Sequence, residues 1–274
     1  LPAETVAEIE RQTVALAKEL RVVGLMNIQF AVKDGVVFIL EVNPRASRTA
    51  PFVSKATGVP LPRLATQVML GKTLKELDPW SMRRSGYVSV KESVFPFRRF
   101  PGVDILLGPE MRSTGEVMGI APTFEEAFLK GQWGAGQKLP EGGKVFLSVN
   151  DRDKRFVAEV ARQYVDLGFE LLATSGTAGL LAGQGIPSTR VLKVYEGRPN
   201  IVDLIKNGEV SLVINTASGK RTAHDSKAIR QATLHYGVPY STTLSGAKAI
   251  ARAIGAARTT EVRVKSLQEY YKGE

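Results

Sequence analysis

The stretch KVFLSVNDRDKRFVAEVARQYVDLGFELLATSGT, residues 144–177, decides the fold of the second half of the chain. It holds a strand-like run at 144–149, a helical pattern at 155–167 and a second strand-like run at 169–174. The alternation continues, with strands expected at 189–194, 209–215 and 238–242 and helices from 177, near 201–206, at 224–236 and at 244–254. Strands that alternate with helices over short connections predict an α/β fold, a doubly wound parallel sheet with helices on both faces.

A glycine-rich segment, residues 131–143 with five glycines, separates this regular half from the residues before it. The first half is α+β in its pattern: a helix at the start, a hairpin of two strand-like runs, helical stretches ending at 58 and 71, a strand at 87–97 and a short helix at 124–130. We therefore predict two domains, 1–136 and 137–274, which agrees with the usual size of a domain.

The composition excludes several classes of protein. The chain has no cysteine and two histidines, so disulfides, thiolate metal sites and His-rich metal sites are not expected. No apolar run is long enough to cross a membrane and no secretory leader is visible, which predicts a cytoplasmic protein without a membrane partner. The net charge is +10, but the basic residues are dispersed and no nucleic-acid-binding motif accompanies them, so no nucleic-acid partner is expected. A chain that opens inside a helical pattern at Leu1 is expected to be a fragment.

Oxygen-bearing side chains gather on the expected hairpin in the first half. Glu41 lies in an otherwise apolar run, where a bare carboxylate is costly to bury unless it is paired or bound to a cation. With a three-residue loop at 33–35, Gln29 and Glu41 become diagonal neighbours on one face together with Asn43, whereas a two-residue loop would separate them. The face would then offer oxygen ligands suited to Mg²⁺ or Mn²⁺ bridging nucleotide phosphates.

Two arginines follow this strand directly. The guanidinium groups of Arg45 and Arg48 could bind transferred phosphate or carboxylate-like oxygens, which predicts a catalytic role in phosphoryl transfer. The alternative is a structural ion pair of Glu41 with one of them, and spacing alone does not separate the two interpretations.

A second group of polar residues falls at the predicted strand ends of the second half. Thr174 and Thr177 flank a strand-to-helix turn, where backbone N–H groups form a ready anion site. Lys154 follows the first strand, Lys193 lies near the end of the third, and Asn215 ends the fourth. Ligands of such sheets bind beyond these strand ends, so the convergence favours a phosphorylated small molecule.

Four motifs carry a resemblance that covers the chain to its end: NIQF at 27–30, EVNPRASRT at 41–49, PFVSKATG at 51–58 and LGPEMRSTGEVMG at 107–119. They are similar to the ATP-grasp region of carbamoyl-phosphate synthetase large subunits. The resemblance implies the second ATP-grasp half, which phosphorylates carbamate, at its C-terminal end. The family uses ATP and two metal ions, makes carbamoyl phosphate for pyrimidine and arginine synthesis, and receives ammonia from a glutaminase small subunit in an oligomer of that heterodimer.

The same resemblance assigns residue roles. It implies that Gln29 and Glu41 hold one Mg²⁺ or Mn²⁺ ion, that Glu41 and Asn43 hold a second, and that Arg45 and Arg48 lie beside carbamate and the γ-phosphate. The adenine-binding strands and the phosphate-covering lid precede this region in the family, so the 274 residues alone are expected to be inactive.

The second half resembles the methylglyoxal-synthase-like regulatory domain of these synthetases. That likeness implies that UMP or IMP binds to matching positions, namely Lys154, Thr174, Thr177, Lys193 and Asn215. It also implies an ornithine site with Glu92, Tyr240 and Thr242. Two residues depart from the family pattern, Ala217 in place of a Thr and Ser241 in place of an Asp.

Two other functions stay open from the sequence. One is a stand-alone nucleotide-sensing module in which Glu41 is only a structural anion. The other is a methylglyoxal-synthase-like lyase, which the residues favour less, since RPNI at 198–201 replaces the Gly-Gly-Asp-Gln turn that carries the acid/base carboxylate.

Overall fold

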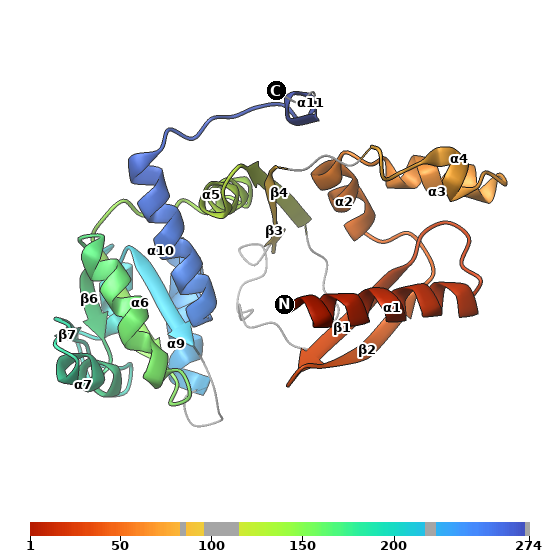
Figure 1. Cartoon of the computed structure of the whole chain (residues 1–274). Coiled ribbons are helices and arrows are strands. Elements are labelled where there is room, and N and C mark those ends of the chain that lie inside the picture. The colour runs from red at the N-terminus through yellow and green to blue at the C-terminus, as the bar shows by residue number, and fades with distance from the viewer. Residues whose placement is uncertain (83–85, 96–114, 217–222, 272–274) are drawn as a thin grey trace. The chain divides into compact units, whose positions relative to one another are not determined.

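The computed structural model describes residues 1–82, 86–95, 115–216 and 223–271 (Figure 1). Part of the motif at 107–119 lies outside the described residues, as does Ala217. The chain divides into two compact units, which are described separately below. The first unit comprises Leu1–Gly86 with Val264–Glu274, and the second comprises Tyr87–Arg263.

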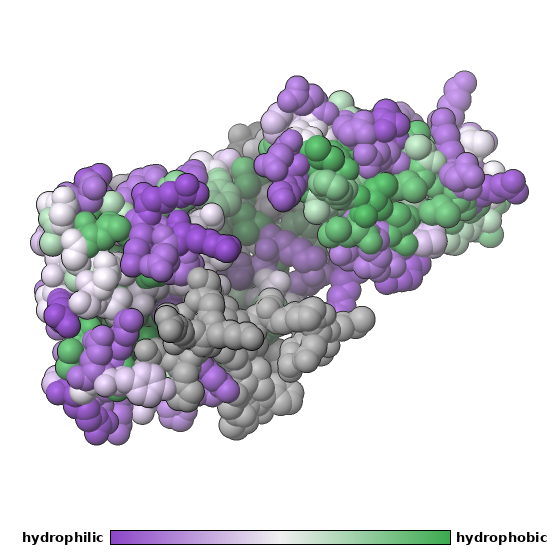
Figure 2. Space-filling model, turned by 90° about the horizontal axis from the view of Figure 1, so that it is seen from below, coloured by the Kyte–Doolittle hydropathy of each residue, from purple (hydrophilic) through white to green (hydrophobic). Residues whose placement is uncertain are grey.

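The first unit is a helix, a hairpin and a group of short helices. Its elements are α1 (Ala3–Glu19), β1 (Asn27–Lys33), β2 (Val36–Asn43), α2 (Thr49–Thr57), α3 (Leu61–Met69), α4 (Leu74–Leu77) and α11 (Leu267–Tyr271). Val59, Leu64 and Leu77 form its small buried cluster. Hydrophobic side chains also gather at the surface, as Figure 2 shows, and on β2 they include Phe38, Ile39 and Leu40, which are 44–66% exposed.

The turn of the hairpin differs from the predicted one, but Gln29 and Glu41 still lie next to each other on one face. Lys33 pairs with Val36, so the loop is the two residues Asp34 and Gly35, both with positive φ (52° and 79°), as a tight Asp-Gly turn requires. The predicted three-residue loop is wrong. A register shift between Gln29 and Phe30, with Leu40 as the additional residue of β2, then brings Gln29 directly opposite Glu41.

The second unit contains two sheets. An antiparallel pair, β3 (Val88–Val94) and β4 (Gly115–Ala121), is followed by helix α5 (Phe124–Gly134). The larger sheet has five parallel strands in the order β7-β6-β5-β8-β9, and these comprise β5 (Lys144–Val149), β6 (Glu170–Ala173), β7 (Thr189–Arg190), β8 (Leu212–Thr216) and β9 (Tyr240–Ser241). Its helices are α6 (Lys154–Asp166), α7 (Ser175–Gly183), α8 (Ile201–Lys206), α9 (Ala223–Tyr236) and α10 (Leu244–Thr259). The predicted α/β fold is confirmed.

Side chains that alternate along the central strand β5 explain why helices cover both faces of the sheet. Val145 and Leu147 of β5 belong to a core shared with residues of α6 and α10, whereas Phe146, between them, belongs to a core shared with residues of α8 and α9. Successive strand residues point to opposite faces, so a strand that is apolar throughout must be covered on both sides. All three side chains are fully buried.

The third strand is shorter than predicted. β7 covers only Thr189–Arg190, and the chain then leaves the sheet, because Leu192 pairs with Asn200 and accepts a backbone hydrogen bond from Ile201. Lys193 consequently lies beyond the strand end, in the connection to α8.

Helix α5 packs within the second unit. It lies against β4 through Gly119 and contacts α10, where Arg252 forms an ion pair with Glu125. The predicted domain boundary at 136/137 therefore falls inside this compact unit. None of the helices in the described part of the chain is long and apolar enough to cross a membrane.

Candidate functional site

The hairpin face of the first unit brings four polar side-chain positions together. Gln29 pairs with Glu41 and Asn27 pairs with Asn43, so all four share one face of the two-stranded sheet. The Asn43 amide Nδ2 donates a hydrogen bond of 2.7 Å to Glu41 Oε1. Contrary to the expectation from its apolar neighbours, Glu41 is exposed, because those neighbours are themselves largely exposed on β2.

The arginines lie immediately beyond this face. Arg45 donates from Nη2 to Asn43 Oδ1 at 3.5 Å and from Nη1 to the carbonyl oxygen of Ala46 at 3.0 Å. Arg48 occupies the position directly before helix α2. Both are exposed. The structure thus places the predicted catalytic arginines within a few residues of the oxygen-bearing face.

The donor set fits a hard divalent cation that obtains further oxygens from elsewhere. Gln29, Glu41 and Asn43 offer one carboxylate and two amide oxygens, and Mg²⁺ is commonly held by one or two carboxylates with phosphate and water oxygens. Within the described residues no three His, Cys, Asp or Glu side chains come together as a metal-binding group. A metal here would therefore depend on a phosphate ligand for much of its coordination.

A cavity of about 320 Å³ lies at the carboxyl ends of the parallel strands in the second unit. It is lined by the β5–α6 loop, the start of α7, the end of β8 and Lys193, and the lining includes Ser148, Asn150, Asp151, Lys154, Thr174, Gly176, Thr177, Lys193 and Thr216. This is where parallel sheets bind ligands.

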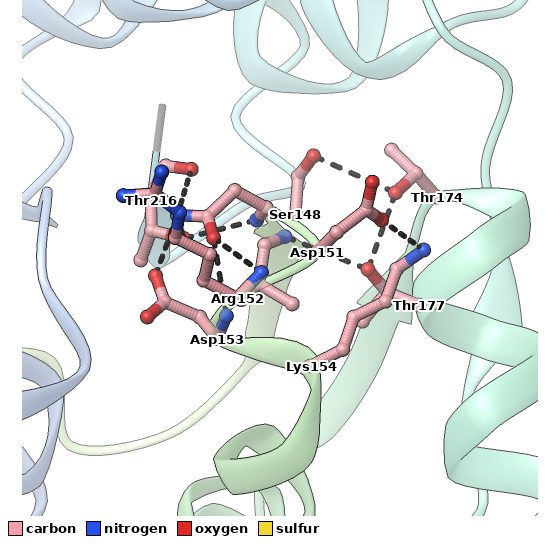
Figure 3. Close-up of polar contacts among 10 residues, drawn as sticks. Ser148, Asp151, Arg152, Asp153, Lys154, Thr174, Thr177 and Thr216 are labelled. Atoms are coloured by element: carbon pink, nitrogen blue, oxygen red, sulfur yellow. Dashed lines mark hydrogen bonds and ion pairs between the residues drawn. The ribbon is translucent and has the colours of Figure 1, made fainter. Parts of the chain in front are cut away.

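Three hydroxyl groups of this cavity, those of Ser148, Thr174 and Thr177, face one another, as Figure 3 shows. Thr174 and Thr177 are 5% and 1% exposed, and their Oγ1 atoms lie 3.5 Å apart. Thr174 also lies 3.5 Å from the Ser148 hydroxyl. Because Thr174 caps α7 and Thr177 lies in its first turn, both accompany the backbone N–H groups that attract anions.

The two predicted lysines lie in the wall of the cavity, whereas Asn215 lies beside it. Lys154 and Lys193 both line the cavity. Asn215 lies next to it on β8, opposite Ser148, but is not among the lining residues. It is 2% exposed, and its Oδ1 has no hydrogen-bond partner among the described residues.

The residues of this site that the sequence reasoning missed include Asn150 and Thr216. β8 extends one residue beyond its predicted end, and the Thr216 hydroxyl there accepts hydrogen bonds of 3.1 Å from the backbone N–H and the side-chain Nδ2 of Asn150. No local pattern links positions 66 residues apart. An Asn at the exit of a strand was the available signal, since such residues commonly hold turns.

A third group lies between β3 and β9 within the second unit. Burial raises the pKa of the Glu92 carboxyl. A hydrogen bond with Gln132 of α5 lowers this pKa, but by less than burial raises it. Burial also raises the pKa of Tyr240, and the nearby Glu92 charge adds to this. The structure therefore brings Glu92 and Tyr240 together, and it adds Gln132, which the sequence reasoning missed.

The loop after β9 is held by its own side chains. The Ser241 hydroxyl donates to the carbonyl oxygen of Thr243 at 2.8 Å, and the Thr243 hydroxyl accepts from the amide of Gly246 at the start of α10. Thr242 lies between them and is half-buried. Ser241 thus has a local structural role at the position where the family pattern carries an Asp.

The residues at 198–203 stand where a methylglyoxal-synthase-like lyase would carry its acid/base carboxylate, and here they cap a helix. Asn200 caps helix α8 by accepting from the amides of Val202 and Asp203, and Asp203 pairs with Arg198 at 2.6 Å. These contacts account for the polar residues at 198–203 without an acid/base function.

Comparisons with known proteins match both halves of the chain. Residues 1–77 match the family described as carbamoyl-phosphate synthase L chain, ATP binding domain, and residues 156–242 match the MGS-like domain. The carbamoyl phosphate synthase large chain of Mesorhizobium japonicum is 53% identical over 99% of this chain and 24% of its own length. That of Myxococcus xanthus is 54% identical over 98% of this chain and 25% of its own length. A solved structure titled "Crystal structure of ForH" covers 48% of this chain and 95% of its own at 17% identity and a TM-score of 0.28, too low to support a conclusion.

Proposed function

The chain is a relative of carbamoyl phosphate synthase large chains over nearly its whole length and spans about a quarter of theirs, and from this premise we propose that it is part of such a large subunit. In the whole protein it would serve an ATP-dependent ligase that phosphorylates carbamate to carbamoyl phosphate. The observation that carries this proposal is the pairing of Gln29 with Glu41 inside the matched ATP-binding region.

In this proposal the hairpin face holds the metal. Gln29, Glu41 and Asn43 would bind Mg²⁺ or Mn²⁺, and the bound ions would neutralise charge on ATP phosphates. Arg45 and Arg48 would bind and orient the carbamate and phosphoryl oxygens, since guanidinium groups suit planar oxyanions. The remainder of the large subunit supplies the adenine-binding part, and a glutaminase small subunit supplies ammonia, in an oligomer of the heterodimer that serves pyrimidine and arginine synthesis.

Manganese binding to the 274-residue chain tests the hairpin. Mn²⁺ titration in the presence of inorganic triphosphate, followed by electron paramagnetic resonance, should detect protein-bound Mn²⁺ that Glu41→Gln removes, because the amide keeps the shape and loses the charge. Glu19→Gln, at the exposed end of α1 in the same unit, is the matched control and should bind as the parent does. Equal Mn²⁺ binding in Glu41→Gln and the parent would contradict the assignment.

The second half is proposed as the effector domain, with the functional division at residues 136/137. UMP or IMP would bind with its phosphate near Lys154, Thr174, Thr177 and Lys193, and Asn215 would contact the ribose. The buried hydroxyls, the two lysines and the start of α7 together support an anionic ligand.

Calorimetric titration with UMP and IMP tests this site. Lys193→Ala should weaken nucleotide binding at least tenfold, the equivalent of about 1.4 kcal/mol. Lys206→Ala, an exposed lysine at the end of α8, removes the same charge away from the cavity and should not weaken binding. Parent-like affinity in Lys193→Ala would remove that lysine from the site.

A separate ornithine site is proposed at Glu92, Tyr240 and Thr242. A carboxylate whose charge is disfavoured by burial gains when a cationic amine binds beside it, which supports this assignment. Glu92→Gln should abolish the heat of ornithine binding and leave UMP binding unchanged, and retained ornithine binding would contradict the proposal.

A further inference from the structure

In the cavity at the ends of β5 and β6, the lysine that opens helix α6 already has an anionic partner from its own loop. Lys154 Nζ lies 2.6 Å from Asp151 Oδ1, and the Asp151 side chain is 92% exposed. Figure 3 shows this ion pair beside Thr177. A Cβ atom built on Gly176 would lie 3.5 Å from Lys154 Nζ, so the ammonium group stands over the first turn of α7.

The loop that carries Asp151 is held in place on both sides. Asn150 Oδ1 accepts hydrogen bonds from the amides of Arg152 and Asp153 at 2.9 Å and 3.1 Å. Asn150 Nδ2 donates to Asp153 Oδ2 at 2.7 Å and to Thr216 on the neighbouring strand. Asp151 lies between these fixed points, so its carboxylate is kept near Lys154 although it is exposed. Through this contact Lys154 lowers the pKa of Asp151, which stays ionised at neutral pH.

We propose that Asp151 is an affinity-setting residue of this site: it occupies Lys154 in the empty cavity, so that any anion must displace the Asp151 carboxylate to reach the lysine, and it thereby shields Lys154 from chloride. This inference rests on the proposed function, in which the cavity binds a phosphorylated effector. The ligand phosphate must replace the Asp151 carboxylate on Lys154 and stand close to that negative charge.

The competition acts on every anion that reaches Lys154. A singly charged anion that reached Lys154 would only replace the Asp151 carboxylate as the partner of the ammonium group, so the net gain in binding free energy would be small. The phosphate of a nucleotide overcomes this competition because it would also contact the start of α7 and the second lysine of the cavity, Lys193. Asp151 therefore lowers the affinity for every anion, but it lowers the occupancy by chloride and simple carboxylates to the point where they do not compete.

Calorimetric titration of the full 274-residue chain with UMP and with inorganic phosphate, at low and high chloride, tests this role. An exposed ion pair of this kind contributes up to about 1 kcal/mol, so Asp151→Asn should bind both ligands about two- to fivefold more tightly at low chloride. Its UMP affinity should then fall more steeply with chloride than that of the parent, because chloride can now occupy Lys154. A merely structural residue would not alter this chloride dependence.

The matched control is Asp166→Asn, which makes the same charge change at the exposed far end of the same helix and should leave affinity and chloride dependence unchanged. Lys154→Met reports on the site itself and should lose UMP binding. If the parent binds UMP and Asp151→Asn binds no more tightly, the affinity-setting role of Asp151 is overturned while the effector site stands. If parent, Asp151→Asn and Lys154→Met all fail to bind UMP and phosphate, the effector function fails and the inference with it.

Discussion

Replacing Gly119 by alanine should destabilise the second unit strongly, because strand β4 and helix α5 touch there through their backbones. A Cβ atom built on Gly119 would lie 1.8 Å from the carbonyl oxygen of Ala127 and 2.6 Å from the amide nitrogen of Gly131. Both are main-chain atoms of α5, so no side-chain rotation relieves the clash. The helix would have to move off the strand by more than about 1 Å to restore ordinary van der Waals contact.

That displacement would open a tightly packed layer. Ala127 and Leu129, on the inner side of α5, are 0% and 2% exposed. Overpacking a core costs about 1–3 kcal/mol, and a backbone clash belongs at the upper end, so we expect a loss of about 3 kcal/mol or more. For a unit of this size that loss corresponds to a Tm roughly 6–12 °C lower.

Thermal and urea unfolding followed by circular dichroism measure this loss. Gly179→Ala is the matched control: Gly179 is an exposed residue of α7 with nothing within 4 Å of an added Cβ, so alanine should be neutral or stabilising by up to about 1 kcal/mol. A loss below about 1 kcal/mol in Gly119→Ala, at unchanged m value, would refute the close backbone approach of α5 to β4.

Three other side chains of the second unit give shorter predictions. Since burial raises the pKa of Glu92 above its ordinary 4.5, the folded unit holds this proton more tightly than the unfolded chain, and stability falls as the pH rises from 4.5 through the raised pKa. Glu92→Gln should therefore melt higher than the parent near pH 7 and equally near pH 4, and a constant difference across thermal scans would contradict this. Tyr164→Phe removes a buried hydroxyl that donates to the Ala247 carbonyl oxygen at 2.7 Å, so the urea midpoint should fall by the equivalent of about 1–2 kcal/mol. Arg252→Ala breaks the exposed ion pair between α10 and α5 and should cost only about 0.5–1 kcal/mol by the same assay.

The α/β fold could be predicted from the sequence because its signal is local. The strands β5, β6 and β8 contain short apolar runs and helix α6 has a clear 3.6-residue pattern, so neither depends on distant residues for recognition. β7 was the exception, since its end is set by the pairing of Leu192 with Asn200 and by no feature of the strand itself.

The hairpin shows where local reasoning fails. The two-residue turn and the extra residue Leu40 each reverse the face on which Glu41 lies, so together they restore the predicted neighbourhood of Gln29 and Glu41. Glu41 is exposed although it lies in an apolar run. An apolar run indicates burial only when something covers it, and Phe38 and Leu40, which precede Glu41 on β2, are 49% and 66% exposed.

Strand β8 relates the two proposed effector sites of the second unit to one another. On one side it pairs with β5, and its Thr216 holds the loop that carries Asp151 and Lys154; on the other it pairs with β9, which carries Tyr240 beside Glu92. A ligand at either site would therefore bias the same strand through backbone contacts.

Thermodynamic linkage requires any such influence to be reciprocal, so the factor by which UMP changes ornithine affinity must equal the factor by which ornithine changes UMP affinity. Because the Thr216 hydroxyl accepts the hydrogen bonds of Asn150 that hold the loop, Thr216→Val should weaken this coupling while leaving Glu92 and Tyr240 in place, and an unchanged factor in calorimetric titrations would show that this contact does not carry it.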